Sequence, residues 1–259
     1  MIPKTLHFIW LDADSDTAPM PDKYVKYYQS WVDRCPDFHI EFWNGEKVKR
    51  LLRKYPQYAD TFAQLQQHIE KCDFARYMIL YDRGGLYSDL DFYCVRNPAP
   101  LLEGRYLMFM WEPEEHNRTG ARNLFNGVIG STPKHPFWSK WIDYMSRRYD
   151  PNNDVLNTTG PSILGKFAIE QQLPPDAFVD TCSFLSKTLP TPMDLVRTRE
   201  TRCAGDQVYG YTEWTDGSFW ALKDLRKNAK FIIIAFKEWI ACIVCVIALA
   251  IWLYTRRRA

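Results

Sequence analysis

The stretch from residue 71 to residue 92 places the strongest constraint on how this chain folds. Apolar residues recur at steps of three and four over residues 65–79, which predicts a helix with one apolar face. Gly84 and Gly85 follow, and glycine readily takes the positive φ that ends a helix. The residues after them alternate with a period of two, as in a β-strand. The stretch therefore predicts a helix, a glycine stop and a strand.

Two pairs of charged residues lie within this stretch. Asp73 and Arg76 are three residues apart, so they share a face of the helix that lies off the apolar stripe. Asp89 and Asp91 would project from one face of the strand, with their Cα atoms roughly 6.5–7 Å apart. Two such carboxylates suit one hard divalent cation, Mg²⁺ or Mn²⁺. A solvated strand edge is the alternative for a bare Asp-x-Asp, but the apolar surroundings favour a metal site.

The segments before this stretch alternate between strand and helix. Residues 5–11 and 38–43 are typical of strands, and residues 22–32 and 46–54 carry helical patterns. This alternation predicts an α/β fold, in which nucleotides bind beyond the carboxyl ends of the strands. The sequence has no Gly-x-Gly-x-x-Gly and no Walker-type loop, so a metal ion would have to bind a diphosphate.

The motifs DFARY at residues 73–77 and GGLYSDLD at residues 84–91 resemble the sugar-binding region of DXD-containing glycosyltransferases. That group includes fungal α-mannosyltransferases, among them α-1,6-mannosyltransferases, inositol-phosphoceramide mannosyltransferases and the clostridial glucosylating toxins. The resemblance covers roughly residues 1–220. It implies a GT-A-type, Rossmann-like fold that binds a nucleotide-sugar, with a catalytic domain over residues 1–225.

The resemblance also implies roles for the charged pairs. Asp91 would bind the metal directly, and Asp89 would bind ribose, sugar or metal-bound water. Asp73 and Arg76 would hold sugar hydroxyls, and Arg76 could also reach the diphosphate. These four are the expected catalytic residues.

The nucleotide would contact the end of the first strand, which also resembles the family. Ile9 and Trp10 would line the base pocket, with Trp10 stacking on the base; an ordinary buried Trp is the alternative. His7 is expected in the core or in a supporting position. Asn126 would contact the donor sugar, although it could also be a turn residue before Gly127.

Two later motifs complete this interpretation. Residues 159–161, Thr-Gly-Pro, would shape the acceptor side at the head of a helix, where threonine can cap and proline can fill the first turn. A purely structural role is equally compatible. Fungal members tend to have a histidine before a late Gly-Ser-Trp, but this chain has Glu213 and Asp216 there. Either carboxylate would supply the late metal ligand, with Ser218 and Trp220 binding metal and diphosphate.

Residues 226–259 are expected to form a membrane anchor with a basic tail. Residues 231–254 are apolar apart from Lys237-Glu238, and the segment is long enough for one transmembrane helix. The chain starts without a recognisable signal peptide, which favours a cytosol-facing domain. Basic residues flank both ends, however, so the orientation in the endomembrane system stays open. Glycosylation sequons at Asn117 and Asn157 would matter only in a lumenal domain.

Composition narrows the remaining possibilities. A net charge of +2 gives no electrostatic basis for binding nucleic acid. The seven cysteines predict neither a zinc site nor a disulfide framework, because the one pair with Cys-x-x-Cys spacing, Cys242 and Cys245, lies inside the apolar segment near the C-terminus, where packing is its expected role.

Together these features predict a metal-dependent retaining glycosyltransferase. It would move a hexose, with mannose favoured, to a membrane-associated lipid or glycan, such as an inositol-phosphoceramide-type sphingolipid. GDP-mannose is the favoured donor and a UDP-hexose is the alternative donor. The alternatives are transfer to protein-linked or other glycans, a metal-dependent nucleotide-sugar hydrolase, and a membrane-anchored carbohydrate-binding protein.

Overall fold

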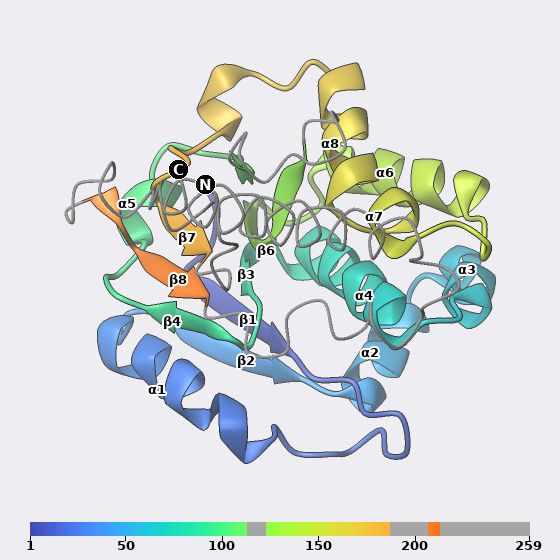
Figure 1. Cartoon of the computed structure of the whole chain (residues 1–259), viewed down its shortest axis with the longest axis horizontal. Helices are drawn as coiled ribbons and strands as arrows, with labels where there is room; N and C mark the ends of the chain where they lie inside the picture. Colours follow the sequence, from blue (N-terminus) through green and yellow to red (C-terminus); the bar gives the residue numbers. More distant parts are fainter. Residues whose placement is uncertain (113–122, 187–206, 213–259) are drawn as a thin grey trace, which may run out of the picture.

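The protein is built on a five-stranded sheet with the strand order β2-β1-β3-β6-β5 (Figure 1). The computed structural model describes residues 1–112, 123–186 and 207–212. β1, β2 and β3 are parallel, whereas β6 runs antiparallel to both β3 and β5. The strands of this sheet are β1 (Thr5–Ile9), β2 (His39–Trp43), β3 (Gly85–Ser88), β5 (Leu107–Trp111) and β6 (Leu124–Ser131).

A smaller sheet and a set of helices complete the described part of the chain. The second sheet has the order β4-β8-β7, with β4 (Phe92–Cys94), β7 (Phe184–Ser186) and β8 (Gly210–Thr212). The helices are α1 (Val25–Arg34), α2 (Gly45–Leu52), α3 (Ala59–Gln64), α4 (His68–Arg83), α5 (Ala99–Leu102), α6 (Pro136–Arg148), α7 (Val155–Thr158) and α8 (Pro161–Glu170). Short 3₁₀ turns lie at Asp22–Tyr24, Pro56–Tyr58 and Pro175–Ala177. The predicted α/β class is confirmed.

Two apolar clusters lie on opposite faces of the sheet, and each contains alternate side chains of the same strands. Leu86 and Met108 pack in the cluster that also contains residues of α1. Their neighbours Tyr87 and Phe109 pack in the other cluster, with residues of α4, α6 and α8 (Figure 1). This alternation is the period of two expected of strands covered on both faces. It places α4 directly against β1, β3 and β6.

Helix α4 is the helix predicted at the centre of the chain. It ends at Gly84, which has φ +66°, and Gly85 follows with φ +90°, so the predicted glycine stop is confirmed. A Cβ on Gly84 would lie 2.5 Å from the backbone nitrogen of Pro133, so glycine is required both for φ and for space. Leu65, predicted at the helix start, precedes the helix instead.

The predicted single strand after Gly85 is wrong, because the chain forms two strands joined by a turn. β3 ends at Ser88 and β4 begins at Phe92, whose N–H donates to the carbonyl of Asp89 at 3.2 Å. The physical reason is that the chain changes partners: β3 pairs with β1 and β6, whereas β4 pairs with β8 in the other sheet. Asp89 and Asp91 therefore lie on a turn, and the spacing expected on one strand face does not apply.

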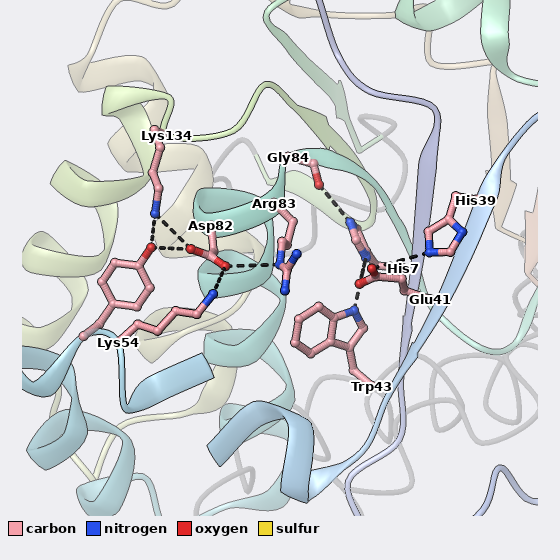
Figure 2. A network of polar contacts seen from close by, with 10 residues as sticks. His7, His39, Glu41, Trp43, Lys54, Asp82, Arg83, Gly84 and Lys134 are labelled. Atoms are coloured by element: carbon pink, nitrogen blue, oxygen red, sulfur yellow. Dashed lines mark hydrogen bonds and ion pairs between the residues drawn. The ribbon is translucent and has the colours of Figure 1, made fainter. Parts of the chain in front are cut away.

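His7 is a core residue, as predicted. Its Nε2 bonds to the carbonyl of Gly84 at 2.9 Å, and its Nδ1 accepts from the indole N–H of Trp43 at 3.1 Å (Figure 2). These partners require Nε2 to carry the proton in the neutral ring. Burial lowers the pKa of His7 to about 4, so the ring is neutral at physiological pH. His7 thereby ties β1 to β2 and to the glycine stop after α4.

Two predictions about the rest of the chain have different outcomes. The predicted membrane anchor lies outside the described residues, among which no helix is both long and apolar enough to cross a bilayer. The sequence predicted no disulfide framework, but Cys182 is disulfide-bonded. The other cysteines of the described part, Cys35, Cys72 and Cys94, are free thiols.

Candidate active site

The candidate site begins where β1 and β3 end at the same edge of the sheet. These strands are parallel with His7 opposite Tyr87, so Trp10 after β1 and Asp89 after β3 emerge at the same edge. This is the edge at which parallel α/β sheets bind their ligands. Ile9 is buried, and Trp10 is half-buried with its ring 5.6 Å from that of Tyr24. The predicted base-binding pair thus lies beside the turn that carries Asp89, and its role stays a prediction.

Arg76 joins three segments at this edge. Its Nη2 lies 3.0 Å from Asp73 Oδ1, and its Nη1 lies 3.3 Å from Asp89 Oδ1. Nη1 also donates to the backbone carbonyl of Asn126 at 2.7 Å. The Arg76 side chain is only 4% exposed, so these are contacts in a poorly solvated environment. Three predicted site residues, Asp73, Asp89 and Asn126, therefore meet at the guanidinium of a fourth.

Asp73 is held on both carboxylate oxygens. Oδ1 accepts from the side-chain amide of Asn126 at 3.1 Å, and Oδ2 accepts from the hydroxyl of Thr159 at 2.9 Å. Burial raises the pKa of Asp73 to about 6, although Arg76 and Thr159 act to lower it. The carboxylate is therefore mostly ionised at pH 7 but takes up a proton near pH 6.

Asp89 is oriented by a tyrosine from the preceding strand, β3. The hydroxyl of Tyr87 donates to Asp89 Oδ1 at 2.6 Å, and the Arg76 guanidinium lies over the Tyr87 ring at 4.6 Å. The backbone N–H of Asp89 donates to the carbonyl of Gly127 at 2.8 Å. A Cβ on Gly127 would lie 2.8 Å from Asp89 Oδ2, so a glycine leaves room for this carboxylate. The Asp89 side chain is 35% exposed and can face a ligand.

The oxygen atoms that this turn offers as ligands suit a hard divalent cation. Asp89 and Asp91 offer carboxylate oxygens, which are the ligands that Mg²⁺ and Mn²⁺ prefer. In the described part of the chain, no three His, Cys, Asp or Glu side chains converge on a possible metal position. The predicted late ligands Glu213, Asp216 and Ser218 lie outside the described residues, as does Trp220.

Three contributing residues were missed or misplaced by the sequence interpretation. Thr159 does not cap α8, because Gly160 is the N-cap; its hydroxyl donates to Asp73 instead, and the expected role of Thr159 on the acceptor side stays a prediction. Tyr77, whose hydroxyl donates to the carbonyl of Thr159 at 2.8 Å, was not proposed at all. Its position four residues after Asp73 on one helix face could have indicated it. Tyr87 could have been found in the same way, because it alternates in phase with Asp89.

Comparisons with known proteins show what this chain resembles. Residues 21–108 match the family model described as glycosyltransferase sugar-binding region containing DXD motif. Mannosyl phosphorylinositol ceramide synthase CSH1 of Saccharomyces cerevisiae is 33% identical over 166 residues, which is 62% of this chain and 41% of that protein. Uncharacterized glycosyltransferase L373 of Acanthamoeba polyphaga mimivirus is 29% identical over 165 residues, which is 63% of each protein.

A solved structure, the PaToxG glycosyltransferase, aligns with a TM-score of 0.46 and 18% identity over 67% of this chain and 70% of that one. The chain spans less than two thirds of the length of the curated relatives named above. The segment with the family match carries Asp73, Arg76, Asp89 and Asp91. The match and the relatives' names confirm the resemblance to DXD-containing glycosyltransferases that was predicted from the sequence.

Proposed function

We propose that this chain is a metal-dependent, retaining glycosyltransferase with a GT-A-type fold. The reaction moves a hexose, with mannose favoured, from a nucleotide-sugar to a membrane-associated acceptor. The observation that carries this proposal is the buried guanidinium of Arg76, which joins Asp73 on α4 to Asp89 after β3. A buried cation held between two carboxylates at the ligand-binding edge of a sheet is a preorganised polar site.

The donor sugar lies against the cluster around Asp73 in this proposal. Asp73 and Asn126 offer an acceptor and a donor for sugar hydroxyls, and their mutual hydrogen bond of 3.1 Å fixes both in place. Arg76 orients the two carboxylates and reaches toward the diphosphate. Ile9 and Trp10 form the base side of the site, because they leave β1 next to the turn after β3.

Asp91 and Asp89 would hold the divalent cation, and the cation would supply positive charge to offset the charge that develops on the leaving diphosphate. Retention of configuration by double displacement would need a carboxylate nucleophile. Asp73 is a poor candidate, because both of its oxygens accept hydrogen bonds and one also faces Arg76. This supports attack by the acceptor hydroxyl on the same face as the departing phosphate.

The acceptor is proposed from the relatives' names. One relative is named a mannosyl phosphorylinositol ceramide synthase, and another an inositol phosphoceramide mannosyltransferase. We therefore propose an inositol-phosphoceramide-type sphingolipid as acceptor and GDP-mannose as donor. The anchor expected over residues 226–259 would keep the catalytic domain beside such a lipid in an endomembrane.

The test is a donor panel with the full chain in detergent. GDP-mannose, UDP-glucose and UDP-galactose are each incubated with Mn²⁺, first for donor hydrolysis and then for transfer to lipid extracts and oligosaccharides. We expect GDP-mannose to be consumed and mannose to appear on the lipid. Consumption of a donor without transfer to any acceptor would indicate a hydrolase, and binding without consumption would indicate a carbohydrate-binding protein.

Asp91→Asn gives the first mutational prediction. We expect metal-dependent transfer to fall below detection while the melting temperature stays within a few degrees, because Asp91 lies on a turn rather than in the core. Asp60→Asn, at an exposed position of α3, is the matched control and should keep full activity. Full activity of Asp91→Asn would overturn the proposed metal site.

A further inference from the structure

Two cysteines from distant parts of the sequence lie together beside the candidate active site. Cys35 follows the last residue of α1, and Cys94 ends β4, the strand that begins directly after the turn carrying Asp89 and Asp91. Their sulfur atoms are 3.9 Å apart and both side chains are buried. A disulfide needs about 2.05 Å between the sulfurs, so the pair must close by about 2 Å, which rotation of two side chains can supply.

The backbone around this pair is fixed by hydrogen bonds between α1 and β4. The N–H of Cys94 donates to the hydroxyl of Ser30 at 2.8 Å. The indole of Trp31 donates to the carbonyl of Phe92 at 2.8 Å. Nε of Arg34 donates to the carbonyl of Val95 at 2.7 Å. Three side chains of α1 thus set the register of β4, and the two thiols face one another as a consequence of the fold.

The pKa values of the two thiols are shifted in opposite directions. A hydrogen bond from Cys35 lowers the pKa of Cys94, whereas the same bond and burial raise the pKa of Cys35. Cys94 is therefore the more readily ionised sulfur of the pair. Thiol–disulfide exchange begins with a thiolate, so the attacking group is defined.

A third cysteine indicates the redox environment. Cys182 is disulfide-bonded, and structural disulfides persist in oxidising compartments such as the lumen of the endoplasmic reticulum. Cys72 provides a contrast within the same chain, because burial raises its pKa to about 12. It is a free thiol, and we expect it to stay reduced where the pair does not.

We propose that Cys35 and Cys94 form a disulfide late in folding, once α1 and β4 have paired and the two thiols face one another, but while an oxidant can still reach them. The Cys94 thiolate attacks the disulfide of an oxidant, either oxidised glutathione or a protein disulfide, and releases one thiol. The Cys35 sulfur then attacks Cys94 Sγ in this mixed disulfide and releases the second thiol. The oxidant gains two electrons and its two sulfurs take the two thiol protons.

The cross-link would join residues 59 positions apart and would fix the base of the turn that carries Asp89 and Asp91. It would close a long loop in the unfolded chain, which is where disulfides stabilise most. The inference does not depend on glycosyl transfer, so it can fail or succeed separately from the proposed function.

The test follows the thiols directly. The full chain is reduced and unfolded, refolded in detergent with a mixture of reduced and oxidised glutathione, blocked with N-ethylmaleimide under denaturing conditions and digested without reduction. We expect mass spectrometry to find the peptides of Cys35 and Cys94 joined, and Cys72 alkylated. Alkylation of both Cys35 and Cys94 would overturn the proposal.

A second measurement keeps the proposal falsifiable if the variants fold poorly. Adding dithiothreitol should lower the melting temperature of the wild type by roughly 5–15 °C more than that of the Cys35→Ala/Cys94→Ala variant. Cys72→Ala is the matched control and should respond to dithiothreitol as the wild type does. An equal response of wild type and double variant would contradict the cross-link.

Discussion

Helix α4 carries two aspartates, nine residues apart, whose environments are opposite. Asp82 near the C-terminal end accepts from Tyr55 at 2.5 Å and lies 2.9 Å from Lys134 and 3.1 Å from Lys54 (Figure 2). Burial alone would raise the pKa of Asp82, but hydrogen bonds from these neighbours outweigh it and lower the pKa to about 2. Asp73 has a single cation, shared with Asp89, and burial raises its pKa to about 6.

The difference separates a structural network from a candidate site. Several cations surround the single charge of Asp82, so its ionised form helps to hold together α4, the segment after α2 and the segment before α6. Asp73 stays ionised at neutral pH against the cost of burial, and Nε of its partner Arg76 is buried without a hydrogen-bond partner among the described residues. Shifted pKa values and unsatisfied polar atoms of this kind gather at functional sites.

The largest expected effect comes from removing the central cation of the candidate site. Arg76→Met would leave Asp73 buried without its charge partner, which costs about 3–5 kcal/mol in unfolding free energy. It would also release Asp89, so donor turnover should fall below detection. Urea denaturation and nucleotide-sugar turnover measure the two losses.

Arg83→Met is the matched control in the other network. Arg83 lies 3.2 Å from Asp82, but its side chain is 49% exposed, and Lys54 and Lys134 remain as partners. We expect a loss of less than about 1 kcal/mol and unchanged turnover. Equal losses in the two variants would mean that Arg76 is an ordinary structural ion pair.

The pH dependence of stability sharpens the comparison between the two networks. The folded-state pKa of Asp73 is about 6, above its ordinary value of 3.8, so the folded protein binds the extra proton and gains stability as pH falls from about 6 toward 4. The shift corresponds to about 3 kcal/mol. Asp73→Asn removes this gain, so its melting temperature should fall relative to wild type between pH 6.5 and 4.5. A constant difference across this range would contradict the raised pKa.

His7, which belongs to the network of Figure 2, should act in the opposite direction. Its folded-state pKa is about 4, below the ordinary 6.5, so its contribution is complete above pH 6.5 and is lost as pH falls toward 4. The full loss is about 3 kcal/mol. His7→Gln keeps a donor and an acceptor but cannot take up the proton. The melting temperature of this variant should therefore rise relative to that of the wild type as pH falls from 6.5 toward 4. Thermal scans of both proteins at the two ends of this range test the prediction.

Local chemistry explains which features the sequence could predict. The stop at Gly84 follows from the conformations of two glycines, and the helix before it from the period of its own residues. The break after Ser88 could not be predicted, because it depends on pairing with β6 and β8, which lie far along the chain. The hydrogen bond that holds Asp73 Oδ2 depends in the same way on Thr159, which is 86 residues away in the sequence.

The smallest expected effect concerns the space beside Asp89. A methyl group at Gly127 would lie 2.8 Å from Asp89 Oδ2 and 2.8 Å from the edge of the Phe125 ring, and both are movable ends of side chains. Gly127→Ala should therefore displace the carboxylate and reduce turnover roughly tenfold, while stability changes by about 1 kcal/mol or less.

Gly104→Ala tests the converse, because nothing lies within 4 Å of its added methyl group but its φ is +70°. Backbone strain should lower stability by about 1 kcal/mol and leave turnover unchanged. If Gly127→Ala instead lost stability and kept its turnover, the glycine would serve packing of the sheet, and the position of Asp89 would not depend on it.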